Sequence, residues 1–81
     1  MNHLNKLETY REIFKECFQY DGDVEKLEYQ QIEEWDSVAH MQLMAVLEEK
    51  FDIELDIDDI IDFSGFKVGI DILKKYDLVI E

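Results

Sequence analysis

The stretch IEEWDSVAHMQLMAVLEEKF, residues 32–51, decides the fold of this chain. It contains neither proline nor glycine, and its apolar residues recur at the three- and four-residue spacing of a helix. Aspartate is a preferred N-cap, because its carboxylate accepts a hydrogen bond from a free N–H group of the first turn. The stretch therefore predicts a helix that starts at Ser37, has Asp36 as its N-cap and ends near Phe51.

This predicted helix has apolar residues on two nearly opposite sides. At about 100° per residue, one broad arc has His40 near its middle and contains Leu43, Met44, Val46, Leu47 and Phe51. The smaller sector contains Val38, Met41 and Ala45, together with Gln42, Glu48 and Glu49. Both sides cannot be buried in so small a domain, so we expect the broad arc to face the core. The smaller sector is then an exposed apolar patch that is rimmed by carboxylates and adjoins Ser37.

Residues before this helix predict one more helix and a long loop. Apolar residues follow a single helical face over residues 5–18, and Asn5 with Glu8 three residues later resembles a capping box. Residues 20–34 lack a clean period and contain Gly22, so they are expected to form a long ordered loop. The side chains expected to attach this loop to the core are Val24, Leu27 and Ile32.

Residues after the central helix predict a short helix and a final longer one. The short helix has Asp56 as its cap and turns three isoleucines inward, namely Ile57, Ile60 and Ile61. Ser64 is expected to cap the last helix, over residues 65–76, whose buried side chains are Phe66, Ile70 and Leu73. The sequence thus predicts a single all-α domain, residues 1–81, with three longer helices, one short helix and a long first loop.

The charge balance restricts the classes of partner. Twenty-one acidic residues against eight basic ones give a formal charge of −13. Such a chain repels nucleic acids and anionic membranes, and it associates faster with basic protein surfaces. There is no apolar run of transmembrane length and no basic-then-apolar leader at the start of the sequence. A single cysteine permits a reducing compartment, so a cytoplasmic monomer that binds neither nucleic acid nor membrane is expected.

Metal sites and catalytic clusters are not predicted. Two histidines and one cysteine provide no clustered ligands for a transition metal. Asp21 and Asp23 have the alternate spacing that opens an EF-hand, but Lys26 stands where that loop needs glycine, and Ile32 where it needs glutamate. Cys17 is expected to be a small buried residue of the first helix.

Ser37 is the residue whose position most suggests a function. The start of a helix has free N–H groups and a positive dipole end, which together accommodate a phosphodiester. The surrounding sequence contains no His–Asp pair that could activate the hydroxyl. Ser37 is therefore expected to be modified by another enzyme rather than to act as a nucleophile of its own. Trp35, two residues earlier, is expected to pack over the loop.

These residues resemble the acyl carrier proteins, whose hallmark is Asp-Ser-Leu at the start of the second helix. Here the triplet is Asp36-Ser37-Val38, a conservative departure. Further matching features are Leu43, Leu47, the acidic pair Glu48-Glu49, the segment KFDIEL, an acidic short helix and a final helix preceded by serine. The resemblance covers nearly the whole chain, and the ordered series is much more specific than the triplet alone.

The resemblance implies that Ser37 carries phosphopantetheine, transferred from coenzyme A by a phosphopantetheinyl transferase. The thiol of this arm would hold an acyl or aminoacyl group as a thioester, and enzymes with basic docking surfaces would load and use it. The carrier itself would not be an enzyme. The implied docking residues are those of the exposed sector, Val38, Met41, Gln42, Ala45, Glu48 and Glu49. His40 and Met44 would be candidates to line a site for the cargo.

Two differences from the sequences of fatty-acid carriers indicate the type of pathway that this carrier would serve. Ala39 and Gln42 occupy positions where many of those carriers have acids, and Trp35 with His40-Met41 looks more like stand-alone carriers of specialised pathways. The alternative reading is an acidic protein-interaction module that works unmodified, as a regulatory subunit or a nucleic-acid mimic.

Overall fold

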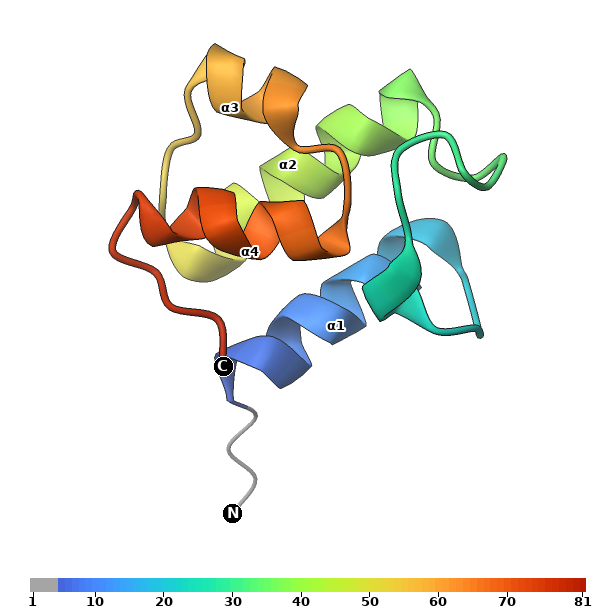
Figure 1. The fold of residues 1–81 in the computed structure, drawn as a ribbon, viewed down its shortest axis with the longest axis horizontal. Helices are drawn as coiled ribbons and strands as arrows, with labels where there is room; N and C mark the ends of the chain where they lie inside the picture. The colour runs from blue at the N-terminus through green and yellow to red at the C-terminus, as the bar shows by residue number, and fades with distance from the viewer. Residues whose placement is uncertain (1–4) are drawn as a thin grey trace.

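The structure, a computed structural model that describes residues 5–81, is all-α (Figure 1). The elements are α1 (Lys6–Phe18), a 3₁₀ turn η1 (Val24–Lys26), α2 (Ser37–Phe51), α3 (Ile57–Asp62) and α4 (Phe66–Lys74). Within residues 5–81 the only β pairing is an isolated bridge between Glu28 and Gly65. The predicted bundle of three longer helices and one short helix is confirmed. Residues 1–4 of the predicted domain lie outside the described part of the chain.

Local caps set the ends of α1 and α2. The Asn5 side chain accepts a hydrogen bond from the Glu8 N–H at 2.7 Å, and the Asp36 carboxylate accepts one from the third residue of α2 at 2.8 Å. Both helices end in a left-handed residue, Gln19 with φ 48° and Asp52 with φ 56°. These contacts satisfy backbone groups that a helix end leaves unpaired.

Aromatic side chains fill the centre of the molecule. The Phe14 ring centroid lies 4.9 Å from that of Tyr10, 4.9 Å from Phe66 and 5.6 Å from Trp35. Trp35 is fully buried and stacks on Phe18, with ring centroids 4.8 Å apart. The expectation that Trp35 packs inside is confirmed, and this one side chain anchors the segment before Ser37 to the core.

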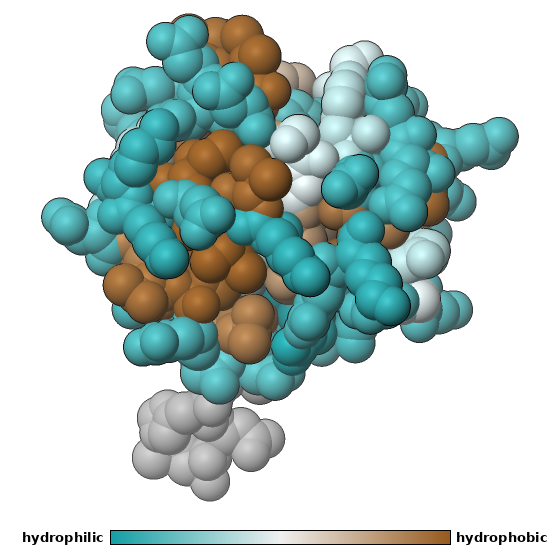
Figure 2. Space-filling view, in the orientation of Figure 1, coloured by the Kyte–Doolittle hydropathy of each residue, from teal (hydrophilic) through white to brown (hydrophobic). Residues whose placement is uncertain are grey.

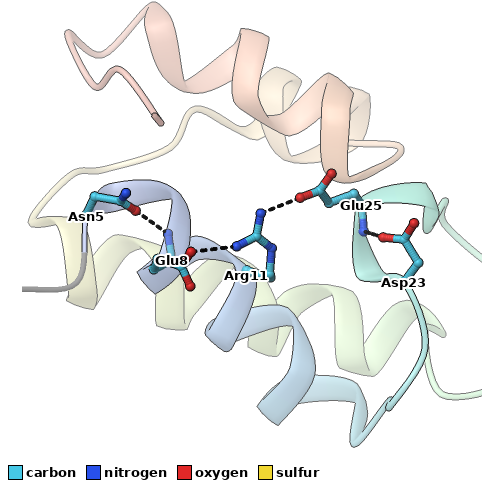
Figure 3. A network of polar contacts seen from close by, with 5 residues as sticks. All are labelled: Asn5, Glu8, Arg11, Asp23 and Glu25. Atoms are coloured by element: carbon cyan, nitrogen blue, oxygen red, sulfur yellow. Dashed lines mark hydrogen bonds and ion pairs between the residues drawn. The ribbon is translucent and has the colours of Figure 1, made fainter.

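The long first loop is attached to α1 and α4 (Figure 1). Val24 and Leu27 are buried, as predicted, and Ile32 is half-buried. Arg11 of α1 bonds both Glu8 and Glu25, and Asp23 caps η1 by accepting a hydrogen bond from the Glu25 N–H at 3.1 Å (Figure 3). These contacts hold the loop in one conformation without a long regular element.

The prediction for α3 is wrong in its orientation. Ile57 and Ile61 are 67% and 71% exposed, and Ile60 alone of the three isoleucines is half-buried. The buried residue is Asp59, whose carboxylate accepts hydrogen bonds from Lys75 and Tyr76 just beyond α4. This pairing turns the acidic residue inward, and the two isoleucines consequently face outward.

The N-terminus of α4 also differs from the prediction. Its N-cap is Gly65 rather than Ser64, and no side chain caps it. The Ser64 carbonyl accepts a hydrogen bond from the Tyr29 N–H at 2.9 Å, and the Phe66 N–H bonds the Leu27 carbonyl at 3.0 Å. The serine therefore belongs to an extended connection that pairs with the first loop. The helix ends at Lys74, not near residue 76; Phe66 and Leu73 are buried as predicted, whereas Ile70 is half-buried.

The Asp59 contacts predict a stability that depends on pH. Hydrogen bonds from Lys75 first, and from Tyr76 second, lower the pKa of the Asp59 carboxyl. A carboxyl whose folded pKa lies below its unfolded value of about 3.9 stabilises the fold above that pH. This contribution is lost as the pH falls through the folded pKa. We therefore expect Asp59→Asn to lower the melting temperature at pH 7, with a difference from the wild type that shrinks as the pH falls below about 4.

The exposed neighbour Asp58 provides the matched control, because Asp58→Asn removes the same charge from the same helix. Thermal unfolding followed by circular dichroism between pH 2 and 8 compares the two variants. Equal melting temperatures of both variants at pH 7 would contradict the assigned role of Asp59.

Candidate functional site at the start of helix α2

Ser37 is the first residue of α2 and is exposed. Asp36 before it has extended backbone, with φ −97° and ψ −173°, and its carboxylate caps the helix through the Ala39 N–H. The cap holds Ser37 in the first turn, where backbone N–H groups have no hydrogen-bond acceptor within the helix. The hydroxyl therefore sits at the positive end of the α2 dipole.

The exposed sector of α2 next to Ser37 is apolar. Val38 is 68% exposed and Met41 is 52% exposed. Gln42 and Ala45 are exposed as well, and these four residues with Ser37 line one open, shallow depression. We call the residues Val38, Met41, Gln42 and Ala45 the α2 patch. The opposite arc is buried at Leu43, Met44 and Leu47, so α2 has the orientation that its sequence pattern predicts.

The two glutamates near the end of α2 have different surroundings. Glu49 is exposed. Glu48 is half-buried, and its Oε2 accepts a hydrogen bond from the Leu55 N–H at 2.8 Å. Glu48 thus orders the connection between α2 and α3. Its partner, Leu55, lies seven residues further along the chain and outside any helix. The helical pattern of α2 therefore could not predict this hydrogen bond.

His40 joins three parts of the fold. Its Nδ1 lies 3.0 Å from Trp35 Nε1, and its Nε2 lies 2.7 Å from the Ile60 carbonyl oxygen. An indole N–H can only donate, so Nδ1 is the acceptor, and the proton on Nε2 is donated to the carbonyl. The side chain is 8% exposed. His40 consequently connects the end of the first loop, α2 and α3.

An apolar groove of about 290 Å³ runs between α2 and α3 with Ser37 at its edge. Its other lining residues are Tyr29, His40, Met41, Ile57, Ile60 and Ile61. Apolar surface is visible over α3 at the top of Figure 2. Of the two predicted cargo-lining residues, His40 lines this groove, whereas Met44 is buried and is not part of its lining. The isoleucines were missed because their pattern was interpreted as a core face.

Cys17 lies in a separate depression between the end of α1 and the start of α2, together with Asp36, Val38 and Gln42. Partial burial raises the pKa of its thiol, and the charge of Glu16 adds to this. A raised pKa leaves less of the nucleophilic thiolate. This thiol is therefore poorly suited to nucleophilic chemistry.

Other site classes find no support in residues 5–81. No group of three or more histidine, cysteine or acidic side chains in this range is arranged to hold a metal ion. The EF-hand-like segment uses Asp23 as a helix cap and Glu25 as a partner of Arg11. None of the helices in this range has the length and apolar character of a membrane span.

Ser37 is thus an exposed serine at a helix N-terminus that lines both the depression of the α2 patch and the α2–α3 groove. Comparison of the chain with protein-family models, curated proteins and solved structures found no match.

Proposed function

We propose that this protein is a carrier of the acyl carrier type, with phosphopantetheine attached to Ser37. The observation that carries the proposal is the exposed Ser37, which follows the Asp36 cap in an Asp-Ser-Val triplet at the start of α2. The α2 patch beside it supports the same function, because the enzymes that load and use a carrier need a surface to bind. The protein performs no catalysis itself.

Attachment requires one phosphoryl transfer. The Ser37 oxygen attacks the phosphorus of coenzyme A that bears the pantetheine, and a new P–O bond forms. The bond from this phosphorus to the oxygen that bridges the two phosphorus atoms breaks, adenosine 3′,5′-bisphosphate leaves with that oxygen, and the serine proton passes to a base of the transferase. The magnesium that offsets the developing charge belongs to that enzyme. This chain contributes the position of the hydroxyl, which the Asp36 cap fixes, and the positive end of the α2 dipole, which favours the phosphate.

The partners are a phosphopantetheinyl transferase and the enzymes that load and transfer acyl or aminoacyl groups. A formal charge of −13 favours fast association with basic docking surfaces. The α2 patch and exposed Glu49 are the proposed contacts, with Glu48 held partly within the fold. A cytoplasmic monomer in a specialised biosynthetic pathway fits this proposal.

One observation also favours a second function. The apolar surface of the α2 patch, with carboxylates nearby, could bind a protein without any attached arm. An acidic interaction module that works unmodified is therefore the alternative, and it needs no chemistry at Ser37.

Intact-mass spectrometry separates these two functions. The purified chain is incubated with coenzyme A, magnesium and a promiscuous phosphopantetheinyl transferase, with a known carrier as a positive control. The proposal predicts the addition of one phosphopantetheine mass, located on Ser37 by peptide mapping. Folded protein that stays unmodified while the control is loaded would favour the unmodified module.

A substitution in the α2 patch tests whether the transferase binds there. Met41→Glu places a charge on an exposed apolar contact beside Ser37, so we expect the loading rate to fall about tenfold, equivalent to about 1.4 kcal/mol. The fold should be unaffected, because half of the Met41 side chain is already exposed. Loading is followed by mass spectrometry over time, and folding by circular dichroism.

Val68→Glu is the matched control for this variant. Val68 is an exposed valine of α4 and does not line the surface around Ser37. The control should load at the wild-type rate. A melting temperature that falls in Met41→Glu but not in the control would show that Met41 packs in the core.

A further inference from the structure

Of the residues that line the groove beside Ser37, His40 is the one that is buried, so it forms the inner wall of the groove. Beyond His40 lies the aromatic core, with ring centroids 6.0 Å away in Trp35 and 6.2 Å away in Phe63. Both of these rings are at most 1% exposed. A chain that enters the core past His40 therefore meets these two buried rings immediately behind the imidazole.

The His40 side chain is fixed on both sides. Trp35 Nε1 donates to one ring nitrogen, and the other donates to the carbonyl of Ile60 in α3. Moving the imidazole aside breaks both hydrogen bonds and leaves a buried indole N–H without its partner, which is costly. The Asp59 contacts to Lys75 and Tyr76 attach α3 to the end of α4 as well, so α3 resists moving away from α2.

We infer that His40 closes the interior of this protein to the carried group, so that the cargo is short or polar and remains outside the core. This inference rests on the proposed function and specifies its substrate class, an aminoacyl or short acyl or hydroxyacyl group. An enclosed cavity of about 150 Å³ holds one benzene ring. The groove of about 290 Å³ is partly open to solvent, so a chain lying in it stays partly in contact with water. It therefore has room for a small group but does not enclose a long chain.

The test loads the wild-type protein with acyl groups of increasing length. A promiscuous transferase attaches acetyl-, butyryl-, octanoyl- and decanoyl-phosphopantetheine from the corresponding coenzyme A thioesters, and mass spectrometry verifies each product. Burial of a whole octanoyl chain in the core would raise the melting temperature by about 20 °C or more. We expect the four forms to differ by less than about 5 °C, because the chain stays in contact with water.

Fluorescence of Trp35, the only tryptophan, gives a second readout. A chain that enters the core must disturb the contact between Trp35 and His40, and this would shift the emission. We expect the emission maximum to be the same for all four acyl forms. A melting temperature that climbs with chain length, together with a shifted emission, would overturn the inference while leaving the carrier function intact.

The variant His40→Ala tests the role of the imidazole directly. Its removal opens the inner wall of the groove, so the octanoyl and decanoyl forms of this variant should gain at least about 5 °C over its acetyl form. Should this variant fail to fold, the wild-type series above still decides the question. A folded His40→Ala protein with no dependence on chain length would show that another residue closes the core.

A second, independent experiment needs no transferase. The double variant Cys17→Ser, Ser37→Cys carries one thiol in residues 5–81, which alkyl methanethiosulfonates of two to ten carbons modify directly. The same two readouts apply, and chain-length dependence here again contradicts the inference. Failure of enzymatic loading would contradict the proposed function alone, because the chemically modified double variant would still report whether the core admits an apolar chain.

Discussion

Replacement of Ser37 by alanine should abolish the addition of phosphopantetheine completely. The reaction needs an oxygen nucleophile at the start of α2, and alanine has none. The fold should persist, because the side chain is exposed, alanine favours helices and the Asp36 cap remains. The melting temperature of Ser37→Ala should therefore stay within a few degrees of the wild-type value. Intact-mass spectrometry after incubation with coenzyme A and the transferase measures the loss.

The chain offers a matched control for this variant. Ser64 is the only other serine, and it is also exposed and close to a helix start. It differs in position, because it precedes the Gly65 cap and lies outside α4. Ser64→Ala should be loaded as fully as the wild type. Mass addition to Ser37→Ala, or its loss in Ser64→Ala, would place the attachment elsewhere.

Replacement of the Trp35 side chain by alanine should have the largest effect on stability. Trp35→Ala removes a fully buried ring that stacks on Phe18 and contacts Phe14, and it also removes the donor to His40. Buried tryptophan-to-alanine changes cost about 3–5 kcal/mol. In a domain of this size such a loss lowers the melting temperature by roughly 12 °C or more. Since the free energy of unfolding of a native protein is only about 5–15 kcal/mol, this substitution removes a large part of it.

Trp35→Phe separates the ring from the hydrogen bond. Phenylalanine keeps an aromatic ring but leaves His40 Nδ1 without a donor, which costs about 1–3 kcal/mol for a buried polar atom. Urea unfolding followed by circular dichroism should therefore rank the wild type first, Trp35→Phe second and Trp35→Ala last. A Trp35→Ala protein as stable as the wild type would mean that this ring does not support the core.

The helix that carries Ser37 illustrates how much a local pattern can predict. Asp36 caps the helix through an N–H three residues away, so both partners are neighbours in the sequence. The observed helix, Ser37–Phe51, has the predicted bounds. Its two faces were also predicted correctly apart from the half-buried Glu48, because fifteen residues cover about four turns and separate the broad apolar arc from the narrow one.

The short helix α3 shows where local patterns fail. Six residues make less than two turns, so the three isoleucines do not define one face reliably. What orients α3 is the contact of Asp59 with Lys75 and Tyr76, sixteen and seventeen residues further along the chain. Similarly, Ser64 looks like a cap in the sequence, but its carbonyl bonds the Tyr29 N–H of the distant first loop.

The sequence by itself determined the all-α class, the cap and faces of α2 and the exposure of Ser37, because each depends on residues within a few positions of one another. Only the tertiary structure decided that the isoleucines of α3 face outward beside Ser37 and that His40 links Trp35 to α3. These features depend on hydrogen bonds and packing between segments far apart in the chain, and helical periodicity contains no information about which segments meet.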